Sequence, residues 1–275
     1  MGSCCPEKMI EQKEKDVKPK PIPKRITKII DSQLELSVCK IYINENECAT
    51  GFLCKIPFPD EFNLLPVLMT NNHVINKEYF LKNKIIKISF DDDKNFKLLE
   101  NVQETKFYSN KTYDISIIEI FPNKDNLNNF LELDNNIWKN EKEDKQDIYL
   151  LQYPNGNDSC VSYGKIKDIQ EYEIEYTCST EFGSSGGPII LLGSFKVIGI
   201  HKGSGKNKED IIFLDIIQSD AYNYGTLLKY PIIEFKKKFE EKNKEKNEIK
   251  VEVKNEIKNE EKNEIKVEVK NRNKS

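Results

Sequence analysis

A serine pair flanked by glycines at residues 181–188 (EFGSSGGP) constrains this chain more than any other stretch. It directly follows the run Tyr172–Cys178, in which apolar residues alternate as in a strand. Glycine lets the backbone turn sharply and direct amide N–H groups at one point. A serine hydroxyl becomes a useful nucleophile when a base takes its proton and hydrogen-bond donors meet the oxyanion that forms. The turn that presents Ser185 therefore has the composition that acyl transfer requires, although an ordinary Ser/Gly loop would look the same in isolation.

The chain has only two histidines, so there are few candidates for the base. His73 lies where the apolar stretch Val67–Met69 runs into a polar turn, and Asp114 opens the apolar run Ile115–Ile120. An Asp at the start of a buried strand is costly unless a partner satisfies it, and orienting an imidazole is one such use. The order His, Asp, Ser along the chain is that of chymotrypsin and differs from the orders of subtilisin and the α/β-hydrolases. A core histidine, a turn-forming Asp and a loop serine are each common, but the three together favour a catalytic interpretation.

Four blocks of sequence resemble a known family. Gly183–Pro188 resembles the G-[DN]-S-G-G-P signature of the chymotrypsin-like serine peptidases. Ala49–Leu53, Thr70–Val74 and Asp114–Ile117 resemble, in the same order, three matching blocks of the branches that are not made as zymogens. Those branches include the glutamyl endopeptidases and the high-temperature-requirement proteases, the latter usually with a PDZ domain that is not expected here. The resemblance spans roughly residues 35–217.

The resemblance implies an all-β fold of two six-stranded Greek-key β-barrels, with the active site in the cleft between them and a C-terminal helix. We expect the protease domain over residues 29–240, with its barrels at roughly 29–125 and 140–225. A basic N-terminal segment, residues 1–28, and a Lys/Glu-rich tail, residues 241–275, are expected to be disordered extensions.

Apolar periodicity gives the expected elements. Strands are predicted between Ile26 and Ile56, where Leu34–Val38 alternates and Asn44–Asn46 supplies a hairpin turn. Pro231–Phe239 predicts a helix with proline in its first turn, and the polar segment Asn123–Glu143 is expected to link the two halves. The remaining predicted strands are Leu64–Met69, Ile85–Phe90, Ile115–Phe121, Ile148–Tyr153, Ser159–Asp168, Glu171–Thr177, Pro188–Leu192, Lys196–His201 and Ile211–Ile217.

The resemblance also implies a role for each site residue. Ser185 would be the nucleophile, His73 the general base and then acid, and Asp114 the group that orients the imidazole. The backbone N–H groups of Gly183 and Ser185 would form the oxyanion hole. Ser184 stands where zymogen members carry an Asp that pairs with a newly cleaved N-terminus. We therefore expect no activation by that route. No cofactor and no metal are expected, because the cysteines lack metal-ligand spacing.

The second histidine, His201, lies in Ile198–Gly203 (IGIHKG), which by the resemblance lines the primary specificity pocket. The glutamyl endopeptidases have a similar Gly-Ile-His-x-Gly run and a Thr just ahead of the nucleophile turn, matching Thr180. The predicted substrate-binding residues are thus Thr180, His201 and Gly203. A histidine and hydroxyl groups can donate hydrogen bonds to a carboxylate or a carboxamide, and a charged imidazole would favour the carboxylate, so we expect cleavage after Glu, with Gln left open. Two alternatives stay open: a protease of apolar specificity that resembles the quality-control enzymes, and a catalytically silent binding module of the same fold.

The N-terminal sequence MGSCC indicates myristoylation of Gly2 and palmitoylation of Cys4 and Cys5, although Pro6 stands where the motif has Ser or Thr. The basic stretch Lys18–Arg25 would add attraction to an anionic membrane face as an extended linker. Without a recognisable secretory signal, we expect an intracellular, cytoplasmic protein that acylation attaches to a membrane.

The overall charge excludes one class of partner. Charged residues form 32% of the chain and are concentrated at its two ends, so the middle can bury a core. The formal net charge of −3 argues against binding to nucleic acid, and a protein or peptide substrate is expected instead. The sequence favours no oligomeric state. In the tail, Lys246–Asn255 recurs identically at Lys262–Asn271, and so polar a segment is expected to be disordered.

Overall fold

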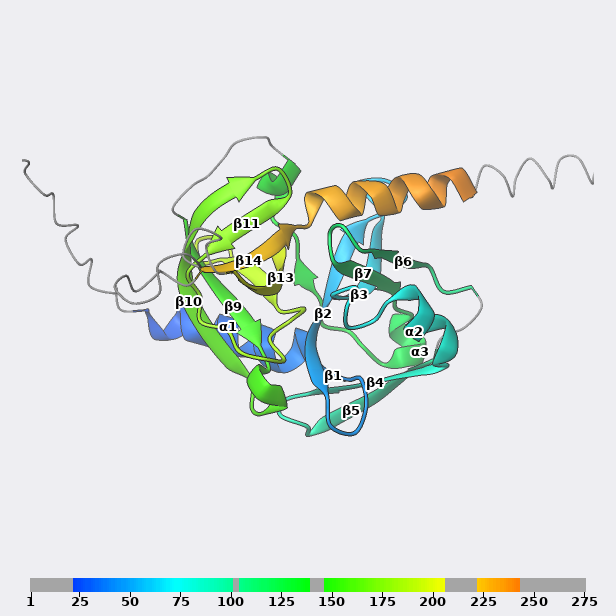
Figure 1. Ribbon diagram of the computed structural model, residues 1–275, viewed down its shortest axis with the longest axis horizontal. Helices are drawn as coiled ribbons and strands as arrows, with labels where there is room; N and C mark the ends of the chain where they lie inside the picture. The colour runs from blue at the N-terminus through cyan, green and yellow to red at the C-terminus, as the bar shows by residue number, and fades with distance from the viewer. Residues whose placement is uncertain (1–21, 101–103, 139–145, 206–221, 243–275) are drawn as a thin grey trace, which may run out of the picture.

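The computed structural model describes residues 22–100, 104–138, 146–205 and 222–242, and two β-structures make up most of this part of the chain (Figure 1). The first half is a sheet in the order β5-β4-β1-β2-β3-β7-β6, to which β8 adds by parallel pairing with β2. Its strands are β1 (Val38–Tyr42), β2 (Cys48–Pro57), β3 (Leu64–Thr70), β4 (Ile85–Phe90), β5 (Asn95–Glu100), β6 (Phe107–Asn110), β7 (Ile115–Glu119) and β8 (Leu131–Glu132).

The second half is a closed barrel in the order β10-β11-β14-β13-β12-β9. The expected all-β double-barrel fold is confirmed, with one correction. The second barrel has the six strands expected, whereas the first half is an eight-stranded sheet whose end strands β5 and β6 do not pair. The barrel strands are β9 (Asp147–Gln152), β10 (Cys160–Gln170), β11 (Glu173–Tyr176), β12 (Pro188–Leu191), β13 (Val197–Gly205) and β14 (Tyr222–Leu227).

The strands predicted from Ile26 are wrong at their start, because helix α1 spans Lys24–Ser37. Ile30 and Leu34 are buried, and their spacing of four places them on one helix face. The alternation Leu34–Val38 suggested a strand, but the helical period wins up to Ser37 and β1 begins only at Val38. The last residues of the expected basic linker therefore form the first turn of α1.

Short helices occupy the connections between strands: α2 (Lys77–Lys82), α3 (Pro122–Asp125), η1 (Asn135–Trp138) and η2 (Pro154–Gly156). The polar segment expected between the halves thus contains α3, β8 and η1. The predicted C-terminal helix is confirmed over residues 229–242, longer at both ends than expected. No described helix is long and apolar enough to cross a membrane.

Each of the two helices near the ends of the described chain contacts the half that is more distant from it in sequence (Figure 1). Gln33 of α1 donates to Phe195 O at 2.8 Å and accepts from the Tyr149 hydroxyl at 2.5 Å, and both partners belong to the second half. Helix 229–242 follows β14 of the second half, yet the ring of its Phe235 lies 5.4 Å from that of Phe58 in the first. One apolar cluster combines residues of both helices and both halves, which fixes the halves against each other.

Several expectations concern residues outside the described ranges. These are the acylation of Gly2, Cys4 and Cys5, most of the basic linker, the strand Ile211–Ile217 and the repeats after residue 242. The barrel's last strand is β14, which was not predicted. Its sequence YNYGTL places Asn and Gly at buried positions, so the apolar alternation is lost.

Candidate active site

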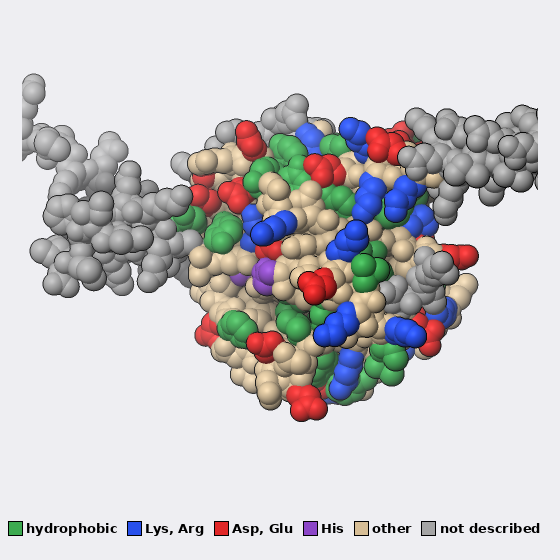
Figure 2. Space-filling view, turned by 45° about the vertical axis from the view of Figure 1, so that its right-hand side comes forward, with side chains coloured by type: hydrophobic (Ala, Val, Ile, Leu, Met, Phe, Trp, Pro, Cys, Tyr) green, Lys and Arg blue, Asp and Glu red, His purple; other side chains and the backbone are tan. Residues whose placement is uncertain are grey.

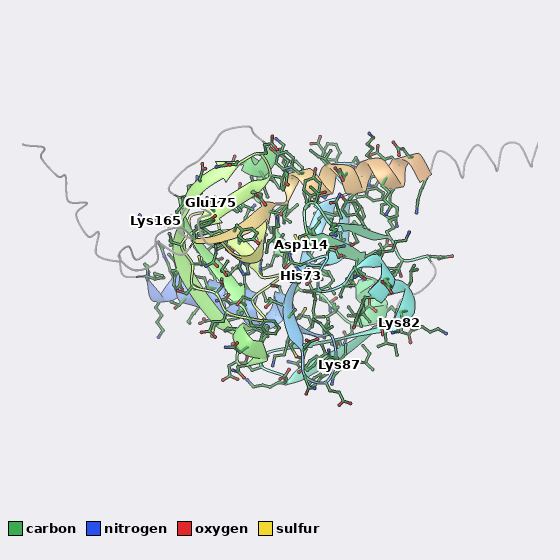
Figure 3. The ribbon with its side chains drawn as sticks, viewed as in Figure 1. His73, Lys82, Lys87, Asp114, Lys165 and Glu175 are labelled. Atoms are coloured by element: carbon green, nitrogen blue, oxygen red, sulfur yellow. The ribbon has the colours of Figure 1, made fainter. Side chains whose placement is uncertain are left out.

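His73 and Asp114 meet because their strands are paired. Strands β3 and β7 are antiparallel, with Thr70 opposite Ser116, so the residues just after β3 lie beside those just before β7. One carboxylate oxygen of Asp114 lies 2.7 Å from His73 Nδ1, and the other accepts from His73 N at 3.0 Å. Figure 3 shows the two side chains together, between the two halves of the molecule.

The backbone around Asp114 is held in an unusual conformation. Asp114 has a φ of 48°, in the left-handed region. Its carbonyl oxygen accepts from Asn71 Nδ2 at 2.8 Å, and Asn71 is fully buried. Sequence analysis assigned no role to Asn71, although it lies two residues before His73. The asparagine fixes the loop that carries the carboxylate.

The pairing determines which imidazole nitrogen is available. Because Asp114 is an acceptor at Nδ1, the neutral imidazole carries its proton there, and Nε2 is left with a lone pair. His73 is half-exposed, with 50% of its side-chain surface accessible, so Nε2 can be reached from the solvent side. In Figure 2 a histidine side chain is exposed near the middle of the face shown. This arrangement can act as a general base.

Ser185 lies in the loop between β11 and β12. Gly183 and Gly186 have φ values of 86° and 89°, which a residue with a Cβ adopts only under strain. Ser185 Oγ donates to Lys202 O at 3.5 Å. Within the described residues it makes no hydrogen bond to His73. The structure thus brings His73 and Asp114 into contact but does not link Ser185 to them by a hydrogen bond.

The amide groups of this loop fall into two sets. The N–H groups of Ser184, Gly186 and Gly187 donate to backbone carbonyls. Those of Gly183 and Ser185 donate to no acceptor within the part of the chain that the structure describes. They are the two groups that the sequence assigns to the oxyanion hole, and both are free to receive an oxyanion.

Ser184 is buried at the position that carries the Asp in zymogen members. Its exposure is 0%, and its hydroxyl oxygen accepts from Glu181 N at 3.0 Å. The loop is therefore closed by a hydrogen bond from a backbone N–H to a hydroxyl group. Position 184 has no carboxylate that could pair with a cleaved N-terminus.

His201 is buried and uncharged. Its exposure is 2%, and burial, with a smaller contribution from His73, lowers its pKa to about 4. Its Nδ1 lies 2.5 Å from the hydroxyl of Tyr176, and burial raises the pKa of that phenol. The phenol makes no other hydrogen bond to a described residue, so we assign it as the donor, which puts the histidine proton on Nε2. The charged imidazole that would favour a carboxylate is thus absent at neutral pH.

The other expected pocket residues are also already engaged. The Thr180 hydroxyl donates to Asn223 Oδ1 at 2.7 Å, so its oxygen remains available only as an acceptor. Gly203 follows an irregularity in the pairing of β13 with β14. The Lys202 ammonium lies 2.8 Å from Glu173, which neutralises the charge beside His201. Sequence analysis missed Tyr176 as a partner of His201, and it missed Asn223 because β14 was not predicted.

Comparison with known proteins identifies the family. A family model described as a trypsin-like peptidase domain matches residues 49–200, more than half of the chain. The chain belongs to the trypsin-like peptidases. No curated protein matches the sequence. The described residues contain no group of His, Cys, Asp and Glu that could hold a metal ion.

Solved structures of proteases have a similar fold. The serine endoprotease from Yersinia pestis is 13% identical with a TM-score of 0.52, over 76% of this chain and 64% of that one. The active form of the Rv3671c protease from M. tuberculosis is 19% identical with a TM-score of 0.49, over 76% of this chain and 83% of that one. The chain spans 64% of the length of the Yersinia protein, and the likeness concerns the fold alone.

Proposed function

We propose that this protein hydrolyses peptide bonds through an acyl-enzyme on Ser185, with His73 as the base and Asp114 as its orienting group. The observation that carries the proposal is the double hydrogen bond of the Asp114 carboxylate to His73 N and Nδ1. It fixes both the tautomer and the orientation of the ring, which is what a histidine base requires. Membership of the trypsin-like peptidases supports the same assignment.

The proposed reaction uses the chain's own groups throughout. Ser185 Oγ leaves Lys202 O and donates to His73 Nε2 when substrate binds, since hydrogen bonds of this kind are often long in free enzymes. The oxygen attacks the scissile carbonyl while its proton passes to His73. The oxyanion is received by the free N–H groups of Gly183 and Ser185. The tetrahedral intermediate then collapses, His73 gives the proton to the leaving amine, and water releases the acyl group by the same steps.

A labelling experiment tests this mechanism. A fluorophosphonate should label the wild type and should not label Ser185→Ala. His73→Ala should lose ~10⁴-fold or more in turnover, because members of such a triad act as a unit. Cysteines are alkylated beforehand so that a thiol cannot mimic the serine. Retained hydrolysis in either variant would overturn the proposal.

We further propose that the residue on the acyl side of the scissile bond is Gln or Glu, with Gln preferred at neutral pH. The support comes from His201, whose Nε2–H is a donor without a positive charge, and from Lys202, whose charge is balanced by Glu173. The Thr180 oxygen is left as an acceptor, which suits the amide N–H₂ of Gln and not a carboxylate. Burying the charge of Glu here would cost free energy that no positive partner returns.

A matched set of peptides tests this preference, with Gln, Glu, Asp, Lys, Leu and Phe at that one position. We expect Gln and Glu to be cleaved and the others to be poor substrates. His201→Ala should erode cleavage after Gln and Glu while a small activated ester still acylates Ser185. Preferred cleavage after Leu or Phe would favour the apolar alternative instead. Binding of peptides without hydrolysis, in a wild type that no probe labels, would favour the silent binding module.

We also propose that acylation of Gly2, Cys4 and Cys5 attaches the enzyme to a cytoplasmic membrane face. The support is the MGSCC terminus followed by the basic segment Lys18–Arg25. Cell fractionation should find the wild type with membranes and a Gly2→Ala, Cys4→Ser, Cys5→Ser variant in the soluble fraction. Equal distribution of the two proteins would end this proposal.

A further inference from the structure

We propose that Thr50, a residue of the first half, is a positioning residue that holds the oxyanion hole of the second half in its working form. The inference rests on the proposed role of Ser185 as the nucleophile. Thr50 lies on β2 and is fully buried. In sequence it belongs to a block that resembles the family, but it touches no expected substrate atom.

The hydroxyl and the backbone N–H of Thr50 form hydrogen bonds to the nucleophile loop and to Tyr153 beside it. Its hydroxyl donates to Gly183 O at 2.8 Å and accepts from Tyr153 N at 3.0 Å. Its backbone N–H donates to Ser185 O at 2.9 Å. Because an amide nitrogen can only donate, the contact with Tyr153 fixes the direction of the hydroxyl proton toward Gly183.

These contacts determine where the free N–H groups point. The carbonyls of Gly183 and Ser185 both accept from Thr50, and they belong to the peptides on either side of the one that carries the Ser185 N–H. In a trans peptide the N–H points opposite to the C=O, and the carbonyl of that central peptide, Ser184 O, accepts from Gly187 N at 3.0 Å. Asn155 N donates to Phe182 O at 2.5 Å, so the Gly183 N–H is turned the other way. Thr50 supports this contact too, since it holds Tyr153, two residues before Asn155.

The glycine at position 186 indicates how closely the loop lies on Thr50. A Cβ at Gly186 would lie 2.0 Å from Thr50 O and 2.6 Å from Thr70 Oγ1. The Thr70 hydroxyl in turn donates to Thr50 O at 2.9 Å, which holds Thr50 from behind. Loop and strand are thus in direct contact, with no room for a side chain between them.

In this chain, hydrogen bonds between uncharged groups take the place of the ion pair that zymogen members use. In zymogen members an Asp beside the nucleophile pairs with a new N-terminus and so forms the oxyanion hole. Here Ser184 carries no charge, and the contacts to Thr50 come from a strand that is already folded. The hole is therefore formed as soon as the two halves are packed together.

The test compares side chains that differ only in the hydroxyl. Thr50→Val keeps the shape and removes the hydrogen bonds, whereas Thr50→Ser keeps them. Thr105→Val is the matched control, because the buried Thr105 hydroxyl has no hydrogen-bond partner among the described residues. If Thr50→Val does not fold, Thr50→Ser and Thr50→Ala provide the same comparison with smaller side chains. Thermal unfolding of each variant verifies that it is folded.

The readouts separate the oxyanion from ordinary binding. Thr50→Val should lower kcat/KM about 10–100-fold through kcat, somewhat less than the loss of an oxyanion donor itself. The affinity for a peptide aldehyde, whose adduct with Ser185 carries the oxyanion, should fall by the same factor. The affinity for the corresponding peptide alcohol should not change. Thr50→Ser and Thr105→Val should stay within about threefold of the wild type in every measurement, since each leaves these bonds in place.

Several results would overturn the inference: full kcat in folded Thr50→Val, equal losses in Thr50→Val and Thr50→Ser, or equal weakening of aldehyde and alcohol. Failure of the proposed function looks different. In that case the wild type is not labelled by a fluorophosphonate, or Ser185→Ala stays active, and the role of Thr50 falls with it. A labelled wild type with an unaffected Thr50→Val contradicts the role of Thr50 alone.

Discussion

His201, a residue of the proposed specificity pocket, also affects the stability of the protein. The folded protein holds the imidazole neutral down to a pKa of about 4, because burial opposes its charge, whereas an exposed histidine titrates at 6.5. Between these two values the unfolded chain binds a proton that the folded chain does not. Stability from this site is therefore complete above about pH 6.5 and is lost as the pH falls toward 4.

We predict that His201→Gln removes part of the acid sensitivity of the protein. Gln does not titrate, so its variant should lose about 3 kcal/mol less than the wild type between these two pH values. The measurement is the free energy of unfolding by urea at a series of pH values. The comparison is a difference between two proteins, so carboxylates common to both cancel. Parallel curves for the two proteins would show that His201 is not held neutral.

Single residues could be predicted from the sequence where the chemistry is local. His73, Asp114 and the Ser185 turn each have a recognisable neighbourhood, and the pairing of β3 with β7 places the first two in contact. The supporting contacts are different. The hydroxyl of Thr50 meets Gly183 across 133 residues, and nothing in the sequence around either residue specifies that meeting.

At the scale of elements, helix 229–242 holds the loop that carries Asp114. Glu234 accepts from Tyr108 at 2.7 Å and from Asn110 Nδ2 and the Tyr113 hydroxyl, both at 3.0 Å. Burial, together with a smaller contribution from this carboxylate, raises the pKa of Tyr113 to about 12. Tyr113 is the residue before Asp114. A side chain of the last described helix thus fixes the approach to Asp114, the proposed orienting carboxylate.

We predict that Glu234→Ala lowers both stability and turnover. Three hydrogen bonds at a partly exposed carboxylate are lost, so unfolding should become easier by about 1 kcal/mol. Turnover should fall several-fold, because the loop before Asp114 loses its anchor. Glu240→Ala on the same helix is the control and should change neither quantity. Unchanged urea unfolding and peptide hydrolysis in Glu234→Ala would contradict the anchoring role.

Elements with a regular apolar pattern could be predicted from the sequence. Elements whose pattern is interrupted, or fits both a helix and a strand, could not. Strands β4 and β12 begin where the periodicity of their sequences indicates. Strands β6 and β14 were not predicted, because polar residues and glycine interrupt the alternation of apolar residues in their sequences. Helix α1 was missed because two periods overlap near Leu34, and its packing in the apolar cluster shared by both halves decides between them.

At the scale of the whole molecule, the two end helices make the halves depend on each other. Helix 229–242 contributes Ile232, Phe235 and Phe239 to the apolar cluster that both halves share. Without this helix, Phe58 and Tyr108 of the first half would lose their aromatic neighbours. The first half is therefore not an independent folding unit.

We predict that a chain ending at residue 228 does not hydrolyse peptides and has no cooperative melting transition. A chain ending at residue 242 should keep kcat/KM within about twofold of the full chain, since it retains every contact described above. Differential scanning calorimetry and peptide hydrolysis are the measurements. Activity in the chain ending at residue 228 would show that the first half holds its shape without the helix.

The two helices near the ends of the described chain also determine the order in which contacts can form during synthesis. Helix α1 leaves the ribosome more than a hundred residues before its partners Tyr149 and Phe195 are made. The side chain of its Gln33 therefore lacks these partners during that time, when nascent chains depend on chaperones. The loop of Asp114 gains its last anchor only when residues up to 242 have been made. An unfinished chain thus lacks contacts on which the proposed active site depends.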